Sequence, residues 1–271
     1  MREALKALCF VPDFCAIKNM GGKVLKQNVT YDNMKRGYEF KPSTLEERRE
    51  FYDKEFSVKS VRKWFRGRGL PQLCAIDAGT KTKIILNKKL SGAIFYFPFR
   101  ELKKKIKEYV PEGIYYDRTR YKNPEKVLNT LNFKENIPQE LAFDVDCDNL
   151  GCWNPKNLES ARECLKKAYK NACVMKKELE KDFRKVRIVY SGRGFHVHVL
   201  DKKAAVLSIK ERENLNKKFK KFGIDPWVSR GYIQLIRMPY SLNGIVSRKV
   251  VPIEDKDEFD ERKALPKFLK N

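Results

Sequence analysis

Two stretches near the middle of the chain alternate hydrophobic and polar positions in the manner of β-strands. In the first, Leu141, Phe143 and Val145 alternate with Asp144 and Asp146. Successive side chains of a strand point to opposite faces, so the apolar positions are predicted to face a core and both carboxylates the other side. At about 3.3 Å per residue these carboxylates are about 6.6 Å apart along the strand, close enough to hold hard divalent cations.

The second stretch predicts a β-hairpin. Apolar side chains alternate on both sides of a glycine-containing turn at residues 191–194: Val186, Ile188 and Tyr190 before it, and Phe195, Val197 and Val199 after it. This alternation places the chain's only two histidines, His196 and His198, together on the opposite face. Ser191 and Arg193 lie in the turn, and a flexible glycine turn with a hydroxyl and a guanidinium is a plausible cradle for a triphosphate.

The rest of the chain mixes both periodicities. Capping boxes begin helices at Thr44 (with Glu47) and at Ser208 (with Glu211), because each hydroxyl and each carboxylate can satisfy a free backbone amide. Apolar spacings of three and four predict a long helix at 158–183 that covers one face of the sheet. The remaining expected helices are 57–65 and 101–110, and the remaining expected strands are 72–77, 82–87, 92–97 and 232–238. This pattern predicts an α+β protein built around one mixed sheet.

Charge indicates the class of partner. The 271 residues include 59 Lys and Arg against 35 Asp and Glu, for a formal net charge of +24 that is spread along the chain. Such a field favours a polyanion, and nucleic acid is preferred over ribosomal or membrane-peripheral roles because neither needs paired acids inside apolar strands. Residues 114–121 interleave aromatics with arginines. This segment could stack on bases or grip phosphates, or could equally be a set of buried tyrosines at a sheet edge.

Cysteine usage and hydropathy indicate the compartment. The seven cysteines are odd in number and unevenly spaced, which argues against a secreted disulfide framework and leaves reduced thiols or a metal site. No apolar stretch approaches the roughly 20 residues that span a bilayer, and the N-terminus lacks a signal-peptide pattern. We therefore expect a cytoplasmic protein without a membrane partner.

The order and spacing of these motifs resemble the catalytic small subunit of archaeal and eukaryotic replicative DNA primases. The resemblance rests on Tyr115-Tyr116 with Arg120-Tyr121, on the strand at 143–146, on the turn and histidine at 191–196, and on residues 235–244. It implies a primase-type α+β catalytic core flanked by helices. The implied core covers residues 43–255, with an N-terminal extension of unknown role at 1–42 and a charged, peripheral C-terminal tail at 256–271.

The resemblance also implies site residues. Two Mg²⁺ or Mn²⁺ ions would be held by three carboxylates, and the incoming nucleotide by a basic and polar set. The implied metal-binding catalytic residues are Asp144, Asp146 and Asp225, and the implied nucleotide-binding residues are Ser191, Arg193, His196, Arg237 and Asn243. Asn243 stands where the family usually has a histidine, so one contact becomes a neutral amide. His198 could equally be an ordinary buried strand residue.

A zinc site is expected to be partly or wholly lost. The family's zinc knuckle follows the strand of the two aspartates, and here only Cys147, Cys152 and Cys164 lie in that region, with neither a CxxC pair nor a histidine. Zinc normally takes four ligands, so a site would need Cys173, Asp148 or water as well.

The expected function is template-directed synthesis of short RNA, or DNA, primers. The implied partners are a single-stranded DNA template, nucleoside triphosphates and the large primase subunit. Two alternatives stay open: a primase-polymerase of repair or of a mobile element, and a non-catalytic nucleic-acid-binding subunit. Metal-dependent nucleotide binding separates the last from the enzymes, because a binding module does not need both carboxylates and the Ser191 turn.

Overall fold

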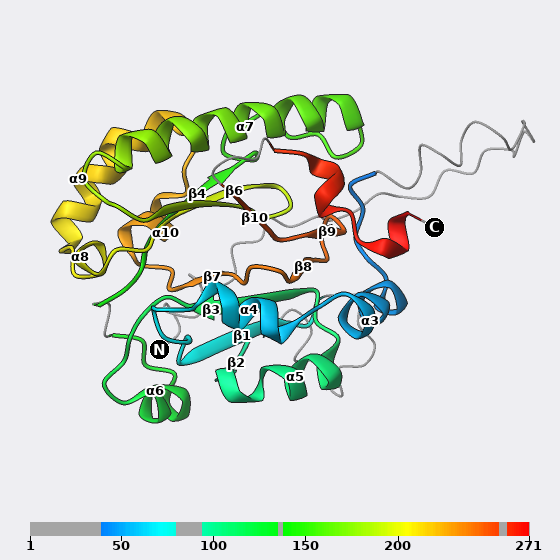
Figure 1. Cartoon of the computed structure of the whole chain (residues 1–271), viewed down its shortest axis with the longest axis horizontal. Helices are drawn as coiled ribbons and strands as arrows, with labels where there is room; N and C mark the ends of the chain where they lie inside the picture. The colour runs from blue at the N-terminus through cyan, green and yellow to red at the C-terminus, as the bar shows by residue number, and fades with distance from the viewer. Residues whose placement is uncertain (1–38, 80–93, 135–137, 255–258, 271) are drawn as a thin grey trace, which may run out of the picture. The chain divides into compact units, whose positions relative to one another are not determined.

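The structure, a computed structural model, describes residues 39–79, 94–134, 138–254 and 259–270, all within one compact unit, Met34–Asn271 (Figure 1). The expected strand at 82–87 and nearly all of the expected extension 1–42 lie outside the described residues. The described α-helices are α3 (Leu45–Lys54), α4 (Val58–Trp64), α5 (Leu102–Tyr109), α6 (Pro124–Thr130), α7 (Leu158–Leu179), α8 (Lys202–Ala205), α9 (Ile209–Phe219) and α10 (Pro226–Arg230). Short 3-10 helices are η2 (Phe99–Glu101), η3 (Lys220–Phe222), η4 (Glu261–Ala264) and η5 (Lys267–Leu269).

The described strands form two four-stranded sheets and one two-stranded sheet. The strands are β1 (Leu73–Asp77), β2 (Ile94–Pro98), β3 (Gly113–Asp117), β4 (Leu141–Asp146), β5 (Val186–Tyr190), β6 (Gly194–Val199), β7 (Leu235–Arg237), β8 (Leu242–Asn243), β9 (Arg248–Lys249) and β10 (Val251–Ile253). Their orders are β2-β1-β3-β7, β10-β5-β6-β4 and β8-β9, and the pairings are antiparallel. The α+β class is thus confirmed, but two antiparallel sheets replace the single mixed sheet. Alternation fixes the faces of a strand and does not reveal its neighbours.

The sheet that contains β4 packs against the long helix. Leu141, Phe143 and Val145 are fully buried in one cluster with the apolar face of α7, as the alternation predicted. Figure 1 shows α7 running along this sheet, and its N-terminus is capped by the Asn157 side chain, which accepts from the Ser160 N–H at 3.0 Å. The predicted helix and its role as a cover are confirmed.

The other four-stranded sheet packs against α3, α4 and α5. Phe51, Val61 and Ile106 of these helices share a buried cluster with the strands, and this cluster also takes in Ala142 of β4. Ala142 lies on the same face of β4 as Asp144, because the two are two positions apart along the strand. The face of β4 that carries the acidic residues is therefore turned toward the sheet β2-β1-β3-β7.

Both predicted capping boxes are present. The Thr44 hydroxyl accepts the Glu47 N–H at 3.2 Å while the Glu47 carboxylate accepts the Thr44 N–H at 2.8 Å. Ser208 and Glu211 form the same reciprocal pair at the start of α9. No helix in the described part of the chain has the length and apolarity needed to cross a membrane.

The C-terminal segment differs from its prediction. Residues 256–271 were expected to be peripheral because they are charged, yet Ala264, Leu265 and Leu269 are buried. Glu261 binds the fully buried Arg248 at 2.8 Å, so a charge in this segment satisfies a charge in the core. The prediction rested on the charged composition and passed over the apolar cluster at residues 264–269.

Candidate active site

The two carboxylates share one face of β4 and the two histidines one face of β6, as predicted, and the strand pairing puts all four on the same side of the sheet. In the register between β4 and β6, Asp144 is opposite His196 and Ala142 is opposite His198. The Nε2 atom of His196 lies 3.7 Å from an Asp144 carboxylate oxygen, and the His196 side chain is only 4% exposed. Burial, followed by the charges of His198, Arg237 and Arg118, holds the pKa of His196 well below its usual range, so the ring is neutral at pH 7.

Asp225 reaches the same place from a distant part of the sequence. Its N–H donates to the Asp144 carbonyl oxygen at 2.8 Å, and the preceding Ile224 forms a β-bridge with Val145. Its carboxylate caps α10 by accepting the Trp227 N–H at 2.8 Å. The third acid, implied only by the family resemblance, is therefore brought to β4 by backbone pairing.

The three carboxylates repel one another in a half-buried setting, in which the side chains of Asp144 and Asp146 are 23% and 19% exposed. Burial raises the pKa of Asp144 well above its usual range, and the charges of Asp146 and Asp225 raise it further, while Arg193 and Arg237 only partly offset this. A divalent cation would relieve such repulsion, and carboxylate oxygens are the hard donors that Mg²⁺ and Mn²⁺ prefer, so the donor chemistry fits. Within the described residues, however, no group of three or more His, Cys, Asp or Glu side chains is arranged to hold a metal ion.

Arg193 is the cation nearest to these acids. It donates to Asp146 at 2.8 Å and its other terminal nitrogen lies 2.8 Å from Asp148. Burial alone would lower the pKa of Arg193, but these carboxylates raise it above its usual range, so the guanidinium stays charged. Asp148 was considered in the sequence only as a zinc ligand. The signal that could have found it is the alternation of aspartates at 144, 146 and 148.

The turn between β5 and β6 is tightly built. The Ser191 N–H donates to the Gly194 carbonyl oxygen at 2.9 Å, and the Asn243 amide donates to the Ser191 carbonyl oxygen, also at 2.9 Å. A Cβ atom at Gly194 would meet the Val145 carbonyl oxygen at 2.2 Å, so this close approach to β4 requires glycine. Asn243 is 4% exposed, and its hydrogen bond to Ser191 stabilises the turn. Its expected nucleotide contact stays a prediction.

Arg237 approaches the acids from the other four-stranded sheet. It is held on β7, which pairs with β3, and its guanidinium carbon lies 4.8 Å from the centre of the Tyr115 ring. Its charge lowers the pKa of Asp144, and its Nη1 atom is buried without a hydrogen-bond partner among the described residues. Arg193 and Arg237 therefore contribute positive charge to Asp144 from different sheets.

Sequence reasoning missed Glu140, which joins the two sheets. Its carboxylate accepts from the Tyr116 hydroxyl at 2.7 Å, binds Arg68 at 2.8 Å and lies 2.8 Å from His198 Nδ1. His198 is fully buried, and burial lowers its pKa, so the neutral ring donates its Nδ1–H to Glu140. His198 is thus a buried strand residue that Glu140 holds through Nδ1, while its Nε2 atom has no hydrogen-bond partner among the described residues. Glu140 lies four positions before Asp144, so the period of two places both side chains on the same face. This spacing was the signal that the sequence offered.

The aromatic and arginine segment at 114–121 is largely structural. Tyr116, Tyr121 and Arg118 are buried, which favours the sheet-edge interpretation over direct contact with bases. Arg118 is 3% exposed, and its guanidinium donates to the carbonyl oxygens of Glu140, Val228 and Ile233 at 2.7, 2.8 and 2.6 Å.

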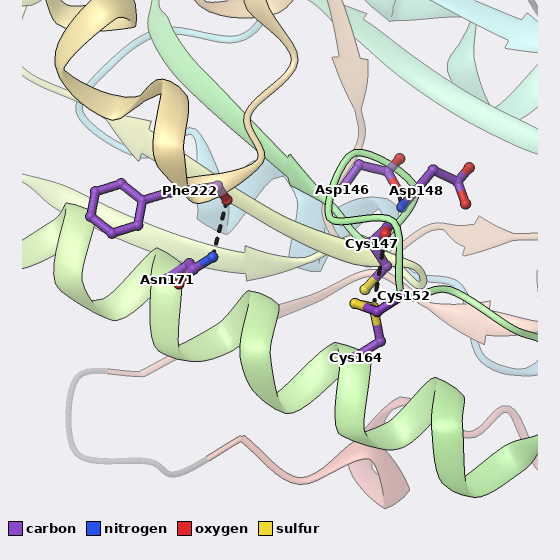
Figure 2. Close-up of a disulfide and its surroundings, with 7 residues drawn as sticks. All are labelled: Asp146, Cys147, Asp148, Cys152, Cys164, Asn171 and Phe222. Atoms are coloured by element: carbon purple, nitrogen blue, oxygen red, sulfur yellow. Dashed lines mark hydrogen bonds between the residues drawn. A yellow bond between two sulfur atoms is a disulfide. The ribbon is translucent and has the colours of Figure 1, made fainter.

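The cysteines after β4 form a disulfide. Figure 2 shows Cys152 bonded to Cys164 of α7, with Cα atoms 5.5 Å apart, and the Cys164 sulfur lies 3.8 Å from the carbonyl oxygen of the buried Cys147. The expectation of reduced thiols is wrong for this pair, because α7 brings together two residues whose spacing gave no signal. Sulfurs bonded to each other do not ligate zinc, so the zinc ligand set that the sequence left open is not formed here.

Comparison with known proteins places these residues in a family. The chain matches no protein-family model. It is 36% identical to an uncharacterized DNA primase small subunit-like protein of Archaeoglobus fulgidus, over 84% of this chain and 91% of that protein. It is 31% identical to the DNA primase small subunit PriS of Pyrobaculum calidifontis over 56% of this chain and 50% of that subunit. For PriS of Pyrococcus furiosus the identity is 29%, over 64% of this chain and 47% of that subunit.

The chain thus spans about half the length of the PriS subunits that it matches, and nearly all of the Archaeoglobus relative. The resemblance inferred from the motifs and the similarity found over most of the chain agree. The chain belongs to the DNA primase small subunit family.

Proposed function

We propose that this chain is the catalytic subunit of a DNA primase, which joins nucleotides on a single-stranded DNA template into short primers. The observation that carries the proposal is the meeting of Asp225 with Asp144, whose backbones are joined at 2.8 Å and whose carboxylates repel one another. Like charges gathered on a half-buried face oppose folding, and perturbed carboxylates of this kind concentrate at functional sites.

In this proposal Asp144, Asp146 and Asp225 bind two divalent cations, Mg²⁺ or Mn²⁺. When bound, such ions activate the attacking 3′-hydroxyl and neutralise the triphosphate and the leaving pyrophosphate. The chain supplies the geometry. The strand register fixes Asp144 opposite His196, and the Trp227 N–H holds the Asp225 carboxylate in place.

The basic groups around these acids are suited to a triphosphate. Arg193 has a side chain that is 34% exposed, and we assign it a phosphate contact that competes with its pairing to Asp146. Arg237, with its unpartnered buried nitrogen, supplies a second phosphate contact from the other sheet. His196 and the Ser191 hydroxyl complete this side of the site, and Asn243 fixes the turn through the Ser191 carbonyl oxygen.

The names of the relatives extend the proposal to a partner. Because PriS proteins are named as small subunits, we propose that this chain works with a large primase subunit. Its formal charge of +24 supports binding to a single-stranded DNA template through the phosphates.

The test is primer synthesis on a single-stranded template, with labelled ribonucleotides and deoxynucleotides in separate reactions and with Mg²⁺ or Mn²⁺. We expect metal-dependent product from the wild type and only background from Asp144→Asn. The matched control is Asp182→Asn, because Asp182 is an exposed residue after α7, and this variant should synthesise as the wild type does.

The outcomes separate the candidate functions. Primer synthesis by a folded Asp144→Asn variant would contradict the assigned mechanism. A folded wild type that makes no product, even with a large subunit added, would favour a non-catalytic nucleic-acid-binding subunit. The comparison of the two sugar types would reveal whether RNA or DNA primers are made.

A further inference from the structure

Two exposed aromatic side chains lie side by side next to the acidic site. Trp227 is 57% exposed and Tyr232 is 44% exposed, and their ring centres are 5.6 Å apart. Among the large hydrophobic residues that the structure describes as exposed, the others are aliphatic and scattered over different elements. Exposed aromatic surface opposes solubility, so a pair of this kind indicates a binding surface.

The frame beneath the two rings is buried and hydrogen-bonded. The N–H of Tyr232 donates to the Trp227 carbonyl oxygen at 3.1 Å, which folds the chain after α10 back against its start. Gly231 makes this reversal with φ at 90°, and its carbonyl oxygen accepts from the Gln139 side chain at 3.2 Å. Together with the Arg118 bonds described above, these contacts fix the backbone that carries both rings, which lowers the entropy lost when a ligand binds.

The pair is directly connected to the proposed catalytic acids. The Trp227 N–H donates to the Asp225 carboxylate at 2.8 Å, and the Asp225 N–H donates to the Asp144 carbonyl oxygen at 2.8 Å. Trp227, on which a flat ligand would stack, is therefore connected to the backbone of β4 through two successive hydrogen bonds of Asp225. This position suits a base of the strand on which the reaction takes place.

The surrounding charge has the sign that a nucleic acid requires. The end of α9 and η3 carry exposed lysines at 217, 220 and 221, just before the loop that leads to Asp225. Asn216, on the same helix, donates to the Pro226 carbonyl oxygen at 3.3 Å and so ties α9 to α10. Helix-dipole compensation explains lysines at a helix end, and the bond from Asn216 to Pro226 ties this basic helix to the one that carries Trp227.

We propose that Trp227 and Tyr232 form a stacking platform for bases of single-stranded nucleic acid, with the lysines of α9 and η3 binding the adjacent phosphates. This inference deepens the proposed function and rests on it, because it names a contact for the template or the growing primer. Stacking tolerates any base sequence, as a polymerase needs, since every base presents an aromatic face.

The test is binding of a fluorescent oligothymidylate to wild type, Trp227→Ala and Tyr232→Ala. We expect each variant to bind at least about 5-fold more weakly, the lower end of what removal of one stacking residue produces. The matched control is Val206→Ala, because Val206 is a 61% exposed aliphatic residue at the end of α8 and its removal should not change the affinity. Equal affinity of both aromatic variants and the wild type would overturn the inference.

Salt dependence separates stacking from charge. The slope of log affinity against log salt should be unchanged in Trp227→Ala and shallower in Lys220→Gln, by about 0.7 if one phosphate contact is lost. The difference in fluorescence between wild type and Trp227→Phe isolates Trp227 from the other tryptophans, and this signal should be quenched by the oligonucleotide. An unquenched signal, or a shallower slope in Trp227→Ala, would contradict stacking.

These readouts do not depend on primer synthesis. Asp144→Asn leaves the platform intact, so it should bind the oligonucleotide while making no primers. If the wild type binds through Trp227 but synthesises nothing, the platform stands and the proposed catalysis fails. If synthesis depends on Asp144 but binding is indifferent to Trp227 and Tyr232, the platform alone fails.

Discussion

Replacing Glu140 with glutamine removes a buried charge that holds the two four-stranded sheets together. Burial alone would raise the pKa of Glu140, but His198, Arg68 and Tyr116 outweigh burial and lower it to about 2, from an ordinary value of 4.5. A difference of about two and a half pKa units corresponds to about 3 kcal/mol of stability. Glutamine also leaves the half-buried Arg68 without its carboxylate partner, which adds to the loss.

The sign of the pH dependence follows from the lowered pKa. The stability contributed by Glu140 is present in full above pH 4.5 and is lost as the pH falls toward about 2. The free energy of unfolding, measured with urea, should therefore be about 3 kcal/mol lower for Glu140→Gln than for the wild type at pH 7. At pH 3 this difference should shrink to about 1 kcal/mol.

The control is Glu163→Gln, which removes a pair with Lys166 whose side chains are 64% and 71% exposed. Exposed pairs contribute little, so this variant should unfold as the wild type does at both pH values. A Glu140→Gln variant that matches the control at pH 7, or whose deficit is the same at pH 3, would refute the assignment of Glu140 as an ionised link between the sheets.

Two further predictions concern stability near the site. Asp144→Asn should raise the melting temperature in EDTA, because it removes a half-buried carboxylate whose pKa is raised by burial, Asp146 and Asp225. Mg²⁺ or Mn²⁺ should then stabilise the wild type more than the variant, and calorimetry that shows no such difference would count against a cation at Asp144. The Cys152–Cys164 disulfide, which joins residues 12 apart, should stabilise the fold by about 3 kcal/mol. Dithiothreitol should lower the urea midpoint of the wild type and leave that of Cys152→Ala unchanged, whereas equal sensitivity would contradict the disulfide.

Local periodicity was sufficient for the parts of the site that lie on single elements. The period of two placed Asp144 and Asp146 on one face of β4 and both histidines on one face of β6, and the structure has them there. The spacings of three and four found α7, and the two capping boxes found the starts of α3 and α9. These predictions succeeded because backbone geometry alone determines which side chains share a face.

Contacts between distant segments could not be predicted in this way. The bond from Tyr116 to Glu140 joins a strand of one sheet to the residue just before β4 of the other, and the disulfide depends on how α7 lies over the loop after β4. Asp225 was found only through the resemblance, since nothing in its neighbourhood indicates pairing with Asp144. The predicted strand at 232–238 is shortened to Leu235–Arg237 because Tyr232 turns back to bond Trp227.

Glu140, just before β4, and Asp144, on β4, face the sheet β2-β1-β3-β7, but the surroundings of these two carboxylates shift their pKa values in opposite directions. Glu140 is surrounded by donors, and its pKa is lowered, so its charge stabilises the fold. For Asp144, four residues later on the same face, burial and then the charges of Asp146 and Asp225 raise the pKa, and Arg193 and Arg237 only partly offset this, so its charge destabilises the fold. Neutralising the two should therefore change the stability at pH 7 in opposite directions. A packing role alone would predict two losses, whereas a gain at Asp144 would mean that the fold tolerates the repulsion for the sake of a positively charged ligand.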